Sequence, residues 1–320
     1  MTHLVRIEDL VVDYASGDGS VRALDGAELA IGAGETVGIV GESGSGKSTL
    51  GAAVGGLLPG AATVARGSVV VADHEVNTLR PNELRALRRE RLGYIFQEPI
   101  GSLDPTMRIG KQVALALPGS GRRADVLTHL ERVRLADPAR VAKAYPHQLS
   151  GGMAQRVAIA MAMAREPEIL IADEPTAALD SQIRAEVLDV IFTLAAEIGT
   201  TILWLSHDLP AVAKRCRRVV VMYGGRVVES GSAHAVLDMP WHPYTSALVR
   251  AVPGAVAEGE RLVSIKGQPP VLTGAAEGCA FAPRCPDALS TCSVDRPPVV
   301  SVHERDVLCH LAGQQVGVSR

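Results

Sequence analysis

The chain has 320 residues, of which 47% are hydrophobic and 21% charged, and its formal net charge is −3. These values are ordinary for a globular protein and argue against a general nucleic-acid binder. The length exceeds that of one usual compact core, so we expect one large domain with an appendage. No apolar run approaches the roughly 20 residues of a transmembrane helix. The acidic residues Glu8 and Asp9 stand where a signal peptide would be apolar, so we expect no export and a membrane role only through partner subunits.

The first predicted elements are strands at 4–13 and 21–31, with the first at the edge of an antiparallel pair. Tyr14 follows the first strand directly. A tyrosine at a strand end usually belongs to the core packing. Its position ahead of a glycine-rich stretch also makes Tyr14 a candidate for stacking on a nucleotide base.

That glycine-rich stretch, GESGSGKST at 41–49, has the strongest functional signal in the chain. It follows the apolar run 36–40, which predicts a buried strand, and it precedes an apolar set suited to a helix packed on a sheet. Strand, loop and helix are the context of a phosphate-binding loop. Its glycines let backbone N–H groups form an anion nest at the positive end of the helix. The loop therefore predicts binding of a nucleoside triphosphate by Gly41, Glu42, Ser43, Gly44, Ser45, Gly46, Lys47, Ser48 and Thr49.

Three residues at the end of this loop receive separate roles. We expect Lys47 to reach the β- and γ-phosphates, Ser48 to bind Mg²⁺ and Thr49 to bond the α-phosphate. The alternative is an ordinary Gly/Ser loop before a helix. That alternative would not require the complete GxxxxGKS pattern in this context.

The next polar strand end belongs to Gln97. A strand is predicted at 67–71, a helix at 82–91, and a buried strand at 92–97 that ends in this amide. A side-chain amide at the carboxyl end of a parallel strand can contact Mg²⁺ and the attacking water, although a plain strand terminus is the alternative. Residues 111–148 are predicted to be helical, with a break at 118–121.

A second anion site is predicted where LSGGMAQR, at 149–156, opens a helix from Met153 to Ala164. Ser150, Gly151 and Gly152 present a hydroxyl and bare backbone donors at a helix N-terminus. The alternative is a simple serine cap, but a cap would not require two glycines.

Two adjacent carboxylates end the next buried strand. The four apolar residues at 169–172 predict a central parallel strand buried on both faces. We expect Asp173 to hold the Mg²⁺ shell and Glu174 to act as general base on water; solvated carboxylates are the alternative. Ala178, Leu179 and Asp180 are predicted to begin the next helix.

His207 follows a third apolar strand, at 203–206. A lone histidine there is more often structural. Because the strand is expected to end near the phosphates, we predict that His207 senses the γ-phosphate. Residues 219–229 predict a hairpin with a two-glycine turn.

Four of the five cysteines cluster near the end of the chain with the spacing C-x5-C-x6-C-x16-C, whereas Cys216 is assigned to the core. In a chain that is not exported, such clustering indicates metal more than disulfides. Structural zinc usually wants a close cysteine pair, which is missing, and four thiolates also suit a [4Fe–4S] cluster. The spacing leaves both metals open, with free buried thiols as a third possibility. The residues are Cys279, Cys285, Cys292 and Cys309.

These motifs, in this order over residues 1 to about 235, resemble those of ABC-transporter ATPases. The resemblance includes the signature LSGGM, which ends at Met153, and the Ala178-Leu179-Asp180 segment at the dimer contact. It implies an α/β fold, with a phosphate-loop core, an antiparallel β-subdomain and a helical signature subdomain at about 98–160. It further implies Mg²⁺-dependent ATP hydrolysis, catalysed by Glu174, Gln97 and His207. In this family the signature of one ATPase subunit closes on ATP held by another.

Beyond about residue 235 the chain is similar to the ATPases of oligopeptide/dipeptide importers. The similarity rests on HPYT at 242–245 and GCAFAPRCPDALSTC at 278–292, and YPHQLSGGM at 145–153 also follows the pattern of these ATPases. It implies a C-terminal extension at 236–320 and favours iron–sulfur over zinc at the four cysteines. The implied partners are a second ABC ATPase, two permeases and an extracytoplasmic substrate-binding protein, with no nucleic acid. The implied location is the cytoplasmic face of the membrane.

The resemblance predicts uptake of di- or oligopeptides, with nickel or another small solute as the alternative cargo. A soluble ABC ATPase acting on ribosomes would usually carry two phosphate loops in one chain. A coiled-coil DNA-repair ATPase would place hundreds of heptad residues between Lys47 and Asp173. One departure from the importer pattern is that the helical segment between Gln97 and Ser150 is shorter than usual, which bears on the surface that receives a permease.

Overall fold

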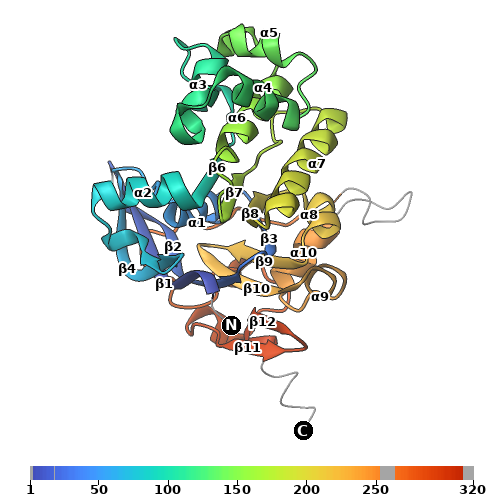
Figure 1. Ribbon diagram of the computed structural model, residues 1–320. Helices are drawn as coiled ribbons and strands as arrows, with labels where there is room; N and C mark the ends of the chain where they lie inside the picture. Colours follow the sequence, from blue (N-terminus) through green and yellow to red (C-terminus); the bar gives the residue numbers. More distant parts are fainter. Residues whose placement is uncertain (1–2, 18, 253–263, 313–320) are drawn as a thin grey trace. The chain divides into compact units, whose positions relative to one another are not determined.

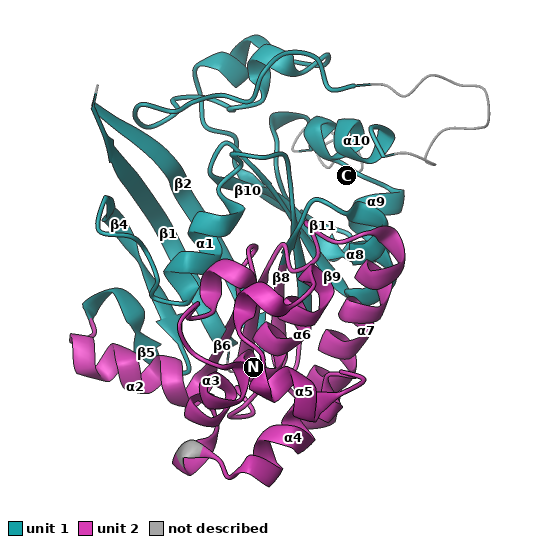
Figure 2. Cartoon of the chain, turned by 90° about the horizontal axis from the view of Figure 1, so that it is seen from above, with its two compact units in different colours: residues 1–32, 36–78, 205–320 teal, residues 33–35, 79–204 magenta. Residues whose placement is uncertain are grey.

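The structure is a computed structural model that describes residues 3–17, 19–252 and 264–312 (Figure 1). The chain forms two compact units (Figure 2): unit 1 contains residues 1–32, 36–78 and 205–320, and unit 2 contains residues 33–35 and 79–204. The C-terminal residues thus share a unit with the phosphate loop. The predicted domain boundary at 235 and the helical subdomain at 98–160 remain predictions. Among the described helices, none is long and apolar enough to span a membrane.

Unit 1 contains a four-stranded antiparallel sheet in the order β2-β1-β4-β5. Strand β1 is inside this sheet, so the prediction that it lies at an edge is wrong. The strand on its second side, β4, comes from residues beyond the phosphate loop, and local patterning does not reveal such a partner. The strands are β1 (His3–Ser16), β2 (Gly19–Gly32), β4 (Ala62–Val71) and β5 (His74–Glu75).

A second group of strands in unit 1 has the order β11-β12-β10-β9-β3. Strand β3 is parallel to β9, and the other pairs are antiparallel. The predicted hairpin of β9 and β10 is confirmed; its turn residues Gly224 and Gly225 have φ values of 52° and 74°, which glycine adopts without strain. The strands are β3 (Thr36–Val40), β9 (Arg218–Tyr223), β10 (Arg226–Ser232), β11 (Val299–Val302) and β12 (Arg305–Leu308), and the helices are α1 (Lys47–Val54), α8 (Leu209–Arg215), α9 (Ala233–Asp238) and α10 (Pro243–Arg250).

Unit 2 is built on parallel strands and a group of helices. Strand β6 is parallel to β7, and β8 lies on the other side of β7. All five residues of β7 are buried, as the uninterrupted apolar run predicts. The predicted break at 118–121 is confirmed by a 3₁₀ turn at Pro118–Ser120. The elements are α2 (Pro81–Arg91), β6 (Leu92–Ile95), α3 (Ile109–Ala116), α4 (Arg123–Arg132), α5 (Pro138–Lys143), α6 (Gly151–Ala162), β7 (Ile169–Asp173), α7 (Ser181–Ile198) and β8 (Thr201–Ser206), the last two residues of which belong to unit 1.

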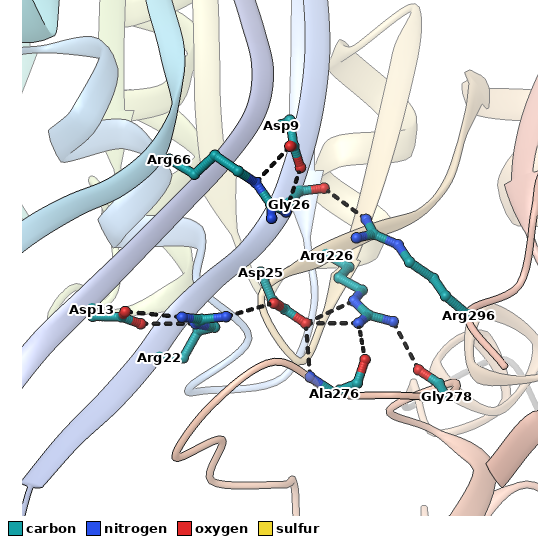
Figure 3. A network of polar contacts seen from close by, with 10 residues as sticks. All are labelled: Asp9, Asp13, Arg22, Asp25, Gly26, Arg66, Arg226, Ala276, Gly278 and Arg296. Atoms are coloured by element: carbon teal, nitrogen blue, oxygen red, sulfur yellow. Dashed lines mark hydrogen bonds and ion pairs between the residues drawn. The ribbon is translucent and has the colours of Figure 1, made fainter. Parts of the chain in front are cut away.

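A buried ion pair joins β10 to the first sheet, and the backbone at 276–278 hydrogen-bonds to both of its side chains (Figure 3). Arg226 donates through Nε and Nη2 to Oδ2 of Asp25, at 3.0 and 2.7 Å, and each side chain is 3% exposed. The same guanidinium donates to the carbonyls of Ala276 and Gly278, and the N–H of Ala276 donates to Asp25. Buried charges are tolerated when all their hydrogen-bonding groups are paired. Backbone of the C-terminal segment therefore completes a charged site in the N-terminal sheet.

Candidate nucleotide site

The phosphate loop leaves β3 and enters α1, as predicted. Lys47 is 5% exposed, and its Nζ donates to the carbonyl oxygens of Gly41 and Glu42 at 2.8 and 3.0 Å. Gly46 precedes the helix with φ 102°. The loop therefore curls around its own ammonium group, and the first turn of α1 offers backbone N–H groups to an anion.

Two of the loop glycines are required by close approaches of the backbone. A Cβ atom on Gly41, which has φ 155°, would lie 2.3 Å from the carbonyl oxygen of Met222. A Cβ on Gly46 would lie 2.6 Å from the carbonyl oxygen of Ala23. Strands β9 and β2 thus fix the path of the loop, and side chains at these two positions would displace it.

Tyr14 lies beside the helix that follows the loop. Its hydroxyl is 3.3 Å from Oγ1 of Thr49, so the two side chains share a hydrogen bond. Ser48 is exposed in the first turn of α1, and His207 is exposed directly after β8. Unit 1 therefore brings the hydroxyl of Tyr14 to the side chain of Thr49, and the stacking of Tyr14 on a base remains a prediction.

Glu42 has partners that the sequence does not reveal. Its N–H donates to the hydroxyl oxygen of Tyr244 at 2.8 Å. Its carboxylate accepts from Nη1 and Nη2 of Arg284 at 2.7 and 3.1 Å. Both partners come from the C-terminal region, 202 and 242 positions along the chain. In the sequence, Tyr244 is singled out only by the similarity of HPYT to the importer pattern.

Unit 2 brings together two predicted catalytic residues at the ends of β6 and β7. Nε2 of Gln97 donates to Oε2 of Glu174 at 3.5 Å. Asp173 ends β7 and is 9% exposed. Glu174 has φ 44°, a left-handed conformation that costs a non-glycine residue about 1–3 kcal/mol and clusters at functional sites. Nothing in the local sequence predicts this conformation.

The signature segment begins α6. Ser150 caps this helix, and its Oγ accepts from the N–H of Met153 at 3.3 Å. Ser150 and Gly151 are exposed, whereas Gly152 is buried, and a Cβ there would lie 2.9 Å from Cγ2 of Ile183 on α7. The serine cap and the anion site are therefore compatible interpretations of one helix start.

The predicted dimer segment lies next to the signature. Asp180 caps α7 by accepting from the N–H of Ile183 at 3.0 Å. Leu179 approaches the position that a Cβ on Gly151 would occupy, at 3.6 Å. The residues from Ala178 to Asp180 are thus held against the start of α6, a proximity that the sequence does not predict.

The four clustered cysteines line one small cavity of about 10 Å³, together with His242 and His310. Burial raises the pKa of Cys279 and Cys309, and it raises the pKa of Cys285 to about 11. Within residues 3–17, 19–252 and 264–312, no group of three or more His, Cys, Asp or Glu side chains is arranged to hold a metal ion. The four thiols border one cavity, and the iron–sulfur cluster remains a prediction. Cys216 is 5% exposed in the core, as predicted.

A complete phosphate loop, a capped signature helix and paired carboxylate and amide strand ends define a P-loop ATPase of the ABC type. The chain matches the ABC transporter family over residues 24–177, and the family of the oligopeptide/dipeptide transporter C-terminal region over residues 228–292.

Curated relatives agree with these matches. The oligopeptide transport ATP-binding protein OppD of Escherichia coli K12 is 42% identical over 302 residues, which cover 92% of this chain and 89% of the relative. The dipeptide transport ATP-binding protein DppD of the same organism is 38% identical over 314 residues, or 96% of each chain.

Solved structures give the same fold. The dimeric ATP-binding cassette MJ0796, bound to ADP and Pi, has a TM-score of 0.64 at 33% identity and covers 72% of this chain and 98% of its own. The structure of cbiO1 from Clostridium perfringens has a TM-score of 0.63 at 30% identity and covers 75% and 92%. The chain therefore belongs to the ABC transporter family, among the members that carry the oligopeptide/dipeptide C-terminal region. The predicted family, α/β fold class and ATPase activity are confirmed.

Proposed function

We propose that the chain is the ATP-hydrolysing subunit of an ABC importer of di- and oligopeptides. The observation that carries the proposal is the match at 228–292 to the oligopeptide/dipeptide transporter C-terminal region. The names of the two E. coli relatives support it. The proposed partners are a second ABC ATPase, two permeases and a substrate-binding protein. The permeases would hold the chain at the cytoplasmic face of the membrane.

ATP binding is proposed to begin at the phosphate loop of unit 1. Lys47 and the N–H groups at the start of α1 supply positive charge for the phosphates, and Tyr14 stacks on adenine. The oxygen ligands proposed for Mg²⁺ are Ser48, Gln97 and Asp173, and their oxygen chemistry suits this ion. A Mg²⁺ ion held by these residues would neutralise charge on the phosphates.

Hydrolysis is proposed to depend on Glu174 as the general base. Its carboxylate takes a proton from the attacking water, while the amide of Gln97 holds the carboxylate in place at 3.5 Å. His207 senses the γ-phosphate. The left-handed conformation of Glu174 supports this role, because strained backbone is retained where it positions a functional group.

The signature is proposed to act on ATP bound by the opposite subunit. Ser150 and Gly151 are exposed at the N-terminus of α6, which suits contact with another chain's γ-phosphate. The helix beyond them packs closely on α7, since a Cβ on Gly152 would lie only 2.9 Å from Cγ2 of Ile183. The dimer contact would then include Ala178, Leu179 and Asp180, which the structure holds beside the same helix start.

A permease is proposed to dock on a groove of about 330 Å³ in unit 2, lined by parts of α2, β6, α3 and α6. Two large apolar side chains on it are exposed: Phe96 by 43% and Leu115 by 56%. Exposed apolar side chains gathered in one groove are typical of a protein-binding surface. The short helical segment between Gln97 and Ser150 thus still builds a surface that suits an apolar partner.

The four cysteines are proposed to hold a [4Fe–4S] cluster, with zinc as the alternative. The position of all four around one cavity supports this, as does an unpartnered donor beside them, and the cavity of about 10 Å³ would have to widen to admit the cluster. His242 is 1% exposed and its Nδ1 accepts from the N–H of Tyr244, so its proton is on Nε2, which has no partner among the described protein atoms. A sulfide or thiolate in the cavity would be a suitable acceptor. The proposed cluster would hold this part of the fold together.

Reconstitution with both permeases tests the importer proposal. We expect the complex in lipid vesicles to hydrolyse ATP faster when its substrate-binding protein is loaded with peptide, and a Glu174→Gln complex to show no such response. If nickel and not peptide stimulates ATP hydrolysis, the proposed cargo is nickel and not peptide. If the chain hydrolyses ATP at the full rate but does not associate with membranes that contain the permeases, the importer assignment is contradicted.

A further inference from the structure

Glu42, the second residue of the phosphate loop, is held from outside the loop at both its backbone and its side chain. Its N–H donates to Tyr244, and its carboxylate accepts two hydrogen bonds from Arg284. Its own carbonyl oxygen accepts from Nζ of Lys47 at 3.0 Å. Glu42 therefore connects the C-terminal region directly to the lysine expected to contact ATP.

The ion pair between Arg284 and Glu42 has the geometry of a strong contact. The Arg284 side chain is 5% exposed and that of Glu42 24%, and both guanidinium Nη atoms take part. Paired hydrogen bonds between a guanidinium and a carboxylate fix direction as well as distance. Arg284 also donates from Nη1 to the hydroxyl of Tyr223 at 3.0 Å and from Nε to the carbonyl of Lys266 at 2.8 Å. These two contacts fix the position of the Arg284 guanidinium independently of Glu42.

The hydroxyl of Tyr244 is also held in a fixed position, by packing of the ring. The Tyr244 side chain is fully buried at the start of α10, with ring centroids 4.4 Å from Tyr223 and 5.4 Å from Phe281. Burial raises the pKa of this phenol well above its ordinary value, so the hydroxyl is neutral. It accepts the N–H of Glu42, which directs that N–H toward α10.

We propose that Arg284 and Tyr244 are positioning residues for ATP binding, which act by fixing Glu42 and, through its carbonyl, the Nζ of Lys47. The inference rests on ATP binding at the phosphate loop and is independent of the cargo. Arg284 immediately precedes Cys285, in the 3₁₀ turn Ala282–Arg284. The order of the four-cysteine segment is therefore transmitted to the phosphate loop through one side chain.

Binding of a fluorescent ATP analogue to the full chain tests Arg284. Arg284→Met keeps the length of the side chain but leaves a largely buried carboxylate unpaired, and we expect it to weaken binding by about tenfold or more. Arg284→Lys keeps the charge without the paired geometry and should give an intermediate loss. The matched control is Arg296→Met: Arg296 also comes from the C-terminal segment, but donates to the carbonyl of Gly26 (Figure 3) and should leave binding unchanged.

A double-mutant cycle separates positioning from general structural damage. If Arg284 acts through Glu42, the variant that combines Glu42→Gln with Arg284→Met should bind ATP no more weakly than Arg284→Met alone. In steady-state assays the single change should raise KM for ATP more than it lowers kcat. Fully additive losses, or equal losses in Arg284→Met and Arg296→Met, would overturn the proposal for Arg284.

Tyr244→Phe provides a second variant if Arg284→Met fails to fold. It removes one hydroxyl and leaves the N–H of Glu42 without its acceptor, so we expect ATP binding to weaken by about fivefold or more. A folded Tyr244→Phe protein that binds ATP like the wild type would remove Tyr244 from this role. Wild-type protein that fails to bind ATP at all would instead contradict the nucleotide site itself.

Discussion

The amide of Gln97 donates to the carboxylate of Glu174, with 3.5 Å between Nε2 and Oε2, although the residues are 77 positions apart. The contact joins the ends of two neighbouring parallel strands, β6 and β7. Such strand ends are where α/β proteins place ligand-binding side chains. The amide thus holds the proposed base, and it does so without adding a charge.

Glu174→Gln is expected to separate ATP binding from hydrolysis. Glutamine keeps the shape of the side chain and removes the proton acceptor, so hydrolysis should fall about 100-fold or more while ATP still binds. Phosphate release and nucleotide binding, measured on the same preparation, check this. Glu168→Gln, at an exposed carboxylate before β7, is the control and should retain activity. Normal turnover by Glu174→Gln would remove Glu174 from the role of base.

Gly151→Asp is expected to block dimerisation and not nucleotide binding. The position is exposed, and a Cβ there would lie at an ordinary contact distance of 3.6 Å from Leu179, so the effect should come from charge and not from a clash. The new carboxylate would oppose the γ-phosphate held by a second chain. Size-exclusion chromatography with ATP should show a monomer for Gly151→Asp and a dimer for Gly151→Ala. Equal loss of ATP binding by the isolated chain would show that the signature acts within its own chain.

Arg226→Met is expected to lower the free energy of unfolding by about 3–5 kcal/mol, because buried Asp25 keeps only its longer contact with Arg22, at 3.3 Å, and the carbonyls of Ala276 and Gly278 lose their donor. The control is Arg66→Met, which breaks the exposed pair of Arg66 with Asp9 (Figure 3) and should cost less than about 1 kcal/mol. Denaturant titration of both variants measures the difference. If the two variants lose similar free energy of unfolding, the buried ion pair stabilises the fold no more than the exposed one.

Alkaline pH is expected to act on the buried thiol of Cys216. Burial raises its pKa to about 12 from an ordinary value of 9.0, so the folded state keeps a proton that the unfolded state loses. The stabilisation is complete below pH 9 and is lost as pH rises toward 12, at about 1.4 kcal/mol per pH unit. Comparing the unfolding of wild type and Cys216→Ala across this range isolates the thiol from other groups. Rapid alkylation of native Cys216 at pH 8 would contradict its burial.

The sequence predicts local features of the site better than long-range ones. The phosphate loop, the cap at Ser150 and the turn at Gly224 each depend on a few adjacent residues, so their patterns are readable. The partners of Glu42 lie 202 and 242 positions away, and no periodicity or turn signal connects them. The wrong prediction that β1 lies at the edge of its sheet has the same cause, because its second neighbouring strand, β4, follows the phosphate loop in the sequence.

Backbone strain is also invisible in the sequence. Glu174 adopts φ 44° although glutamate has no preference for the left-handed region. The conformation must be imposed by the packing around β7. A carboxylate pair at a strand end thus identifies the candidate site, and tertiary structure decides how its second carboxylate is presented.

Iron binding at the C-terminal cysteines is the last prediction. Protein purified without oxygen should be brown, absorb near 400 nm and contain about four irons per chain. In the segment around Cys279, Cys285, Cys292 and Cys309, strands β11 and β12 extend the sheet from β10, whereas the part that carries the first three cysteines has only short 3₁₀ turns, so a cluster would supply stability there.

Replacing Cys285 and Cys292 with serine should bleach the colour and make the segment sensitive to protease, whereas Cys216→Ser should keep the colour. Because Arg284 joins this segment to Glu42, the bleached variant should also bind ATP more weakly. If protein made under iron-replete conditions contains zinc and no iron, the metal assignment changes to zinc and the stabilising role is kept. A metal-free segment that still resists protease would contradict both, since the thiols would then be ordinary core side chains packed around their small cavity.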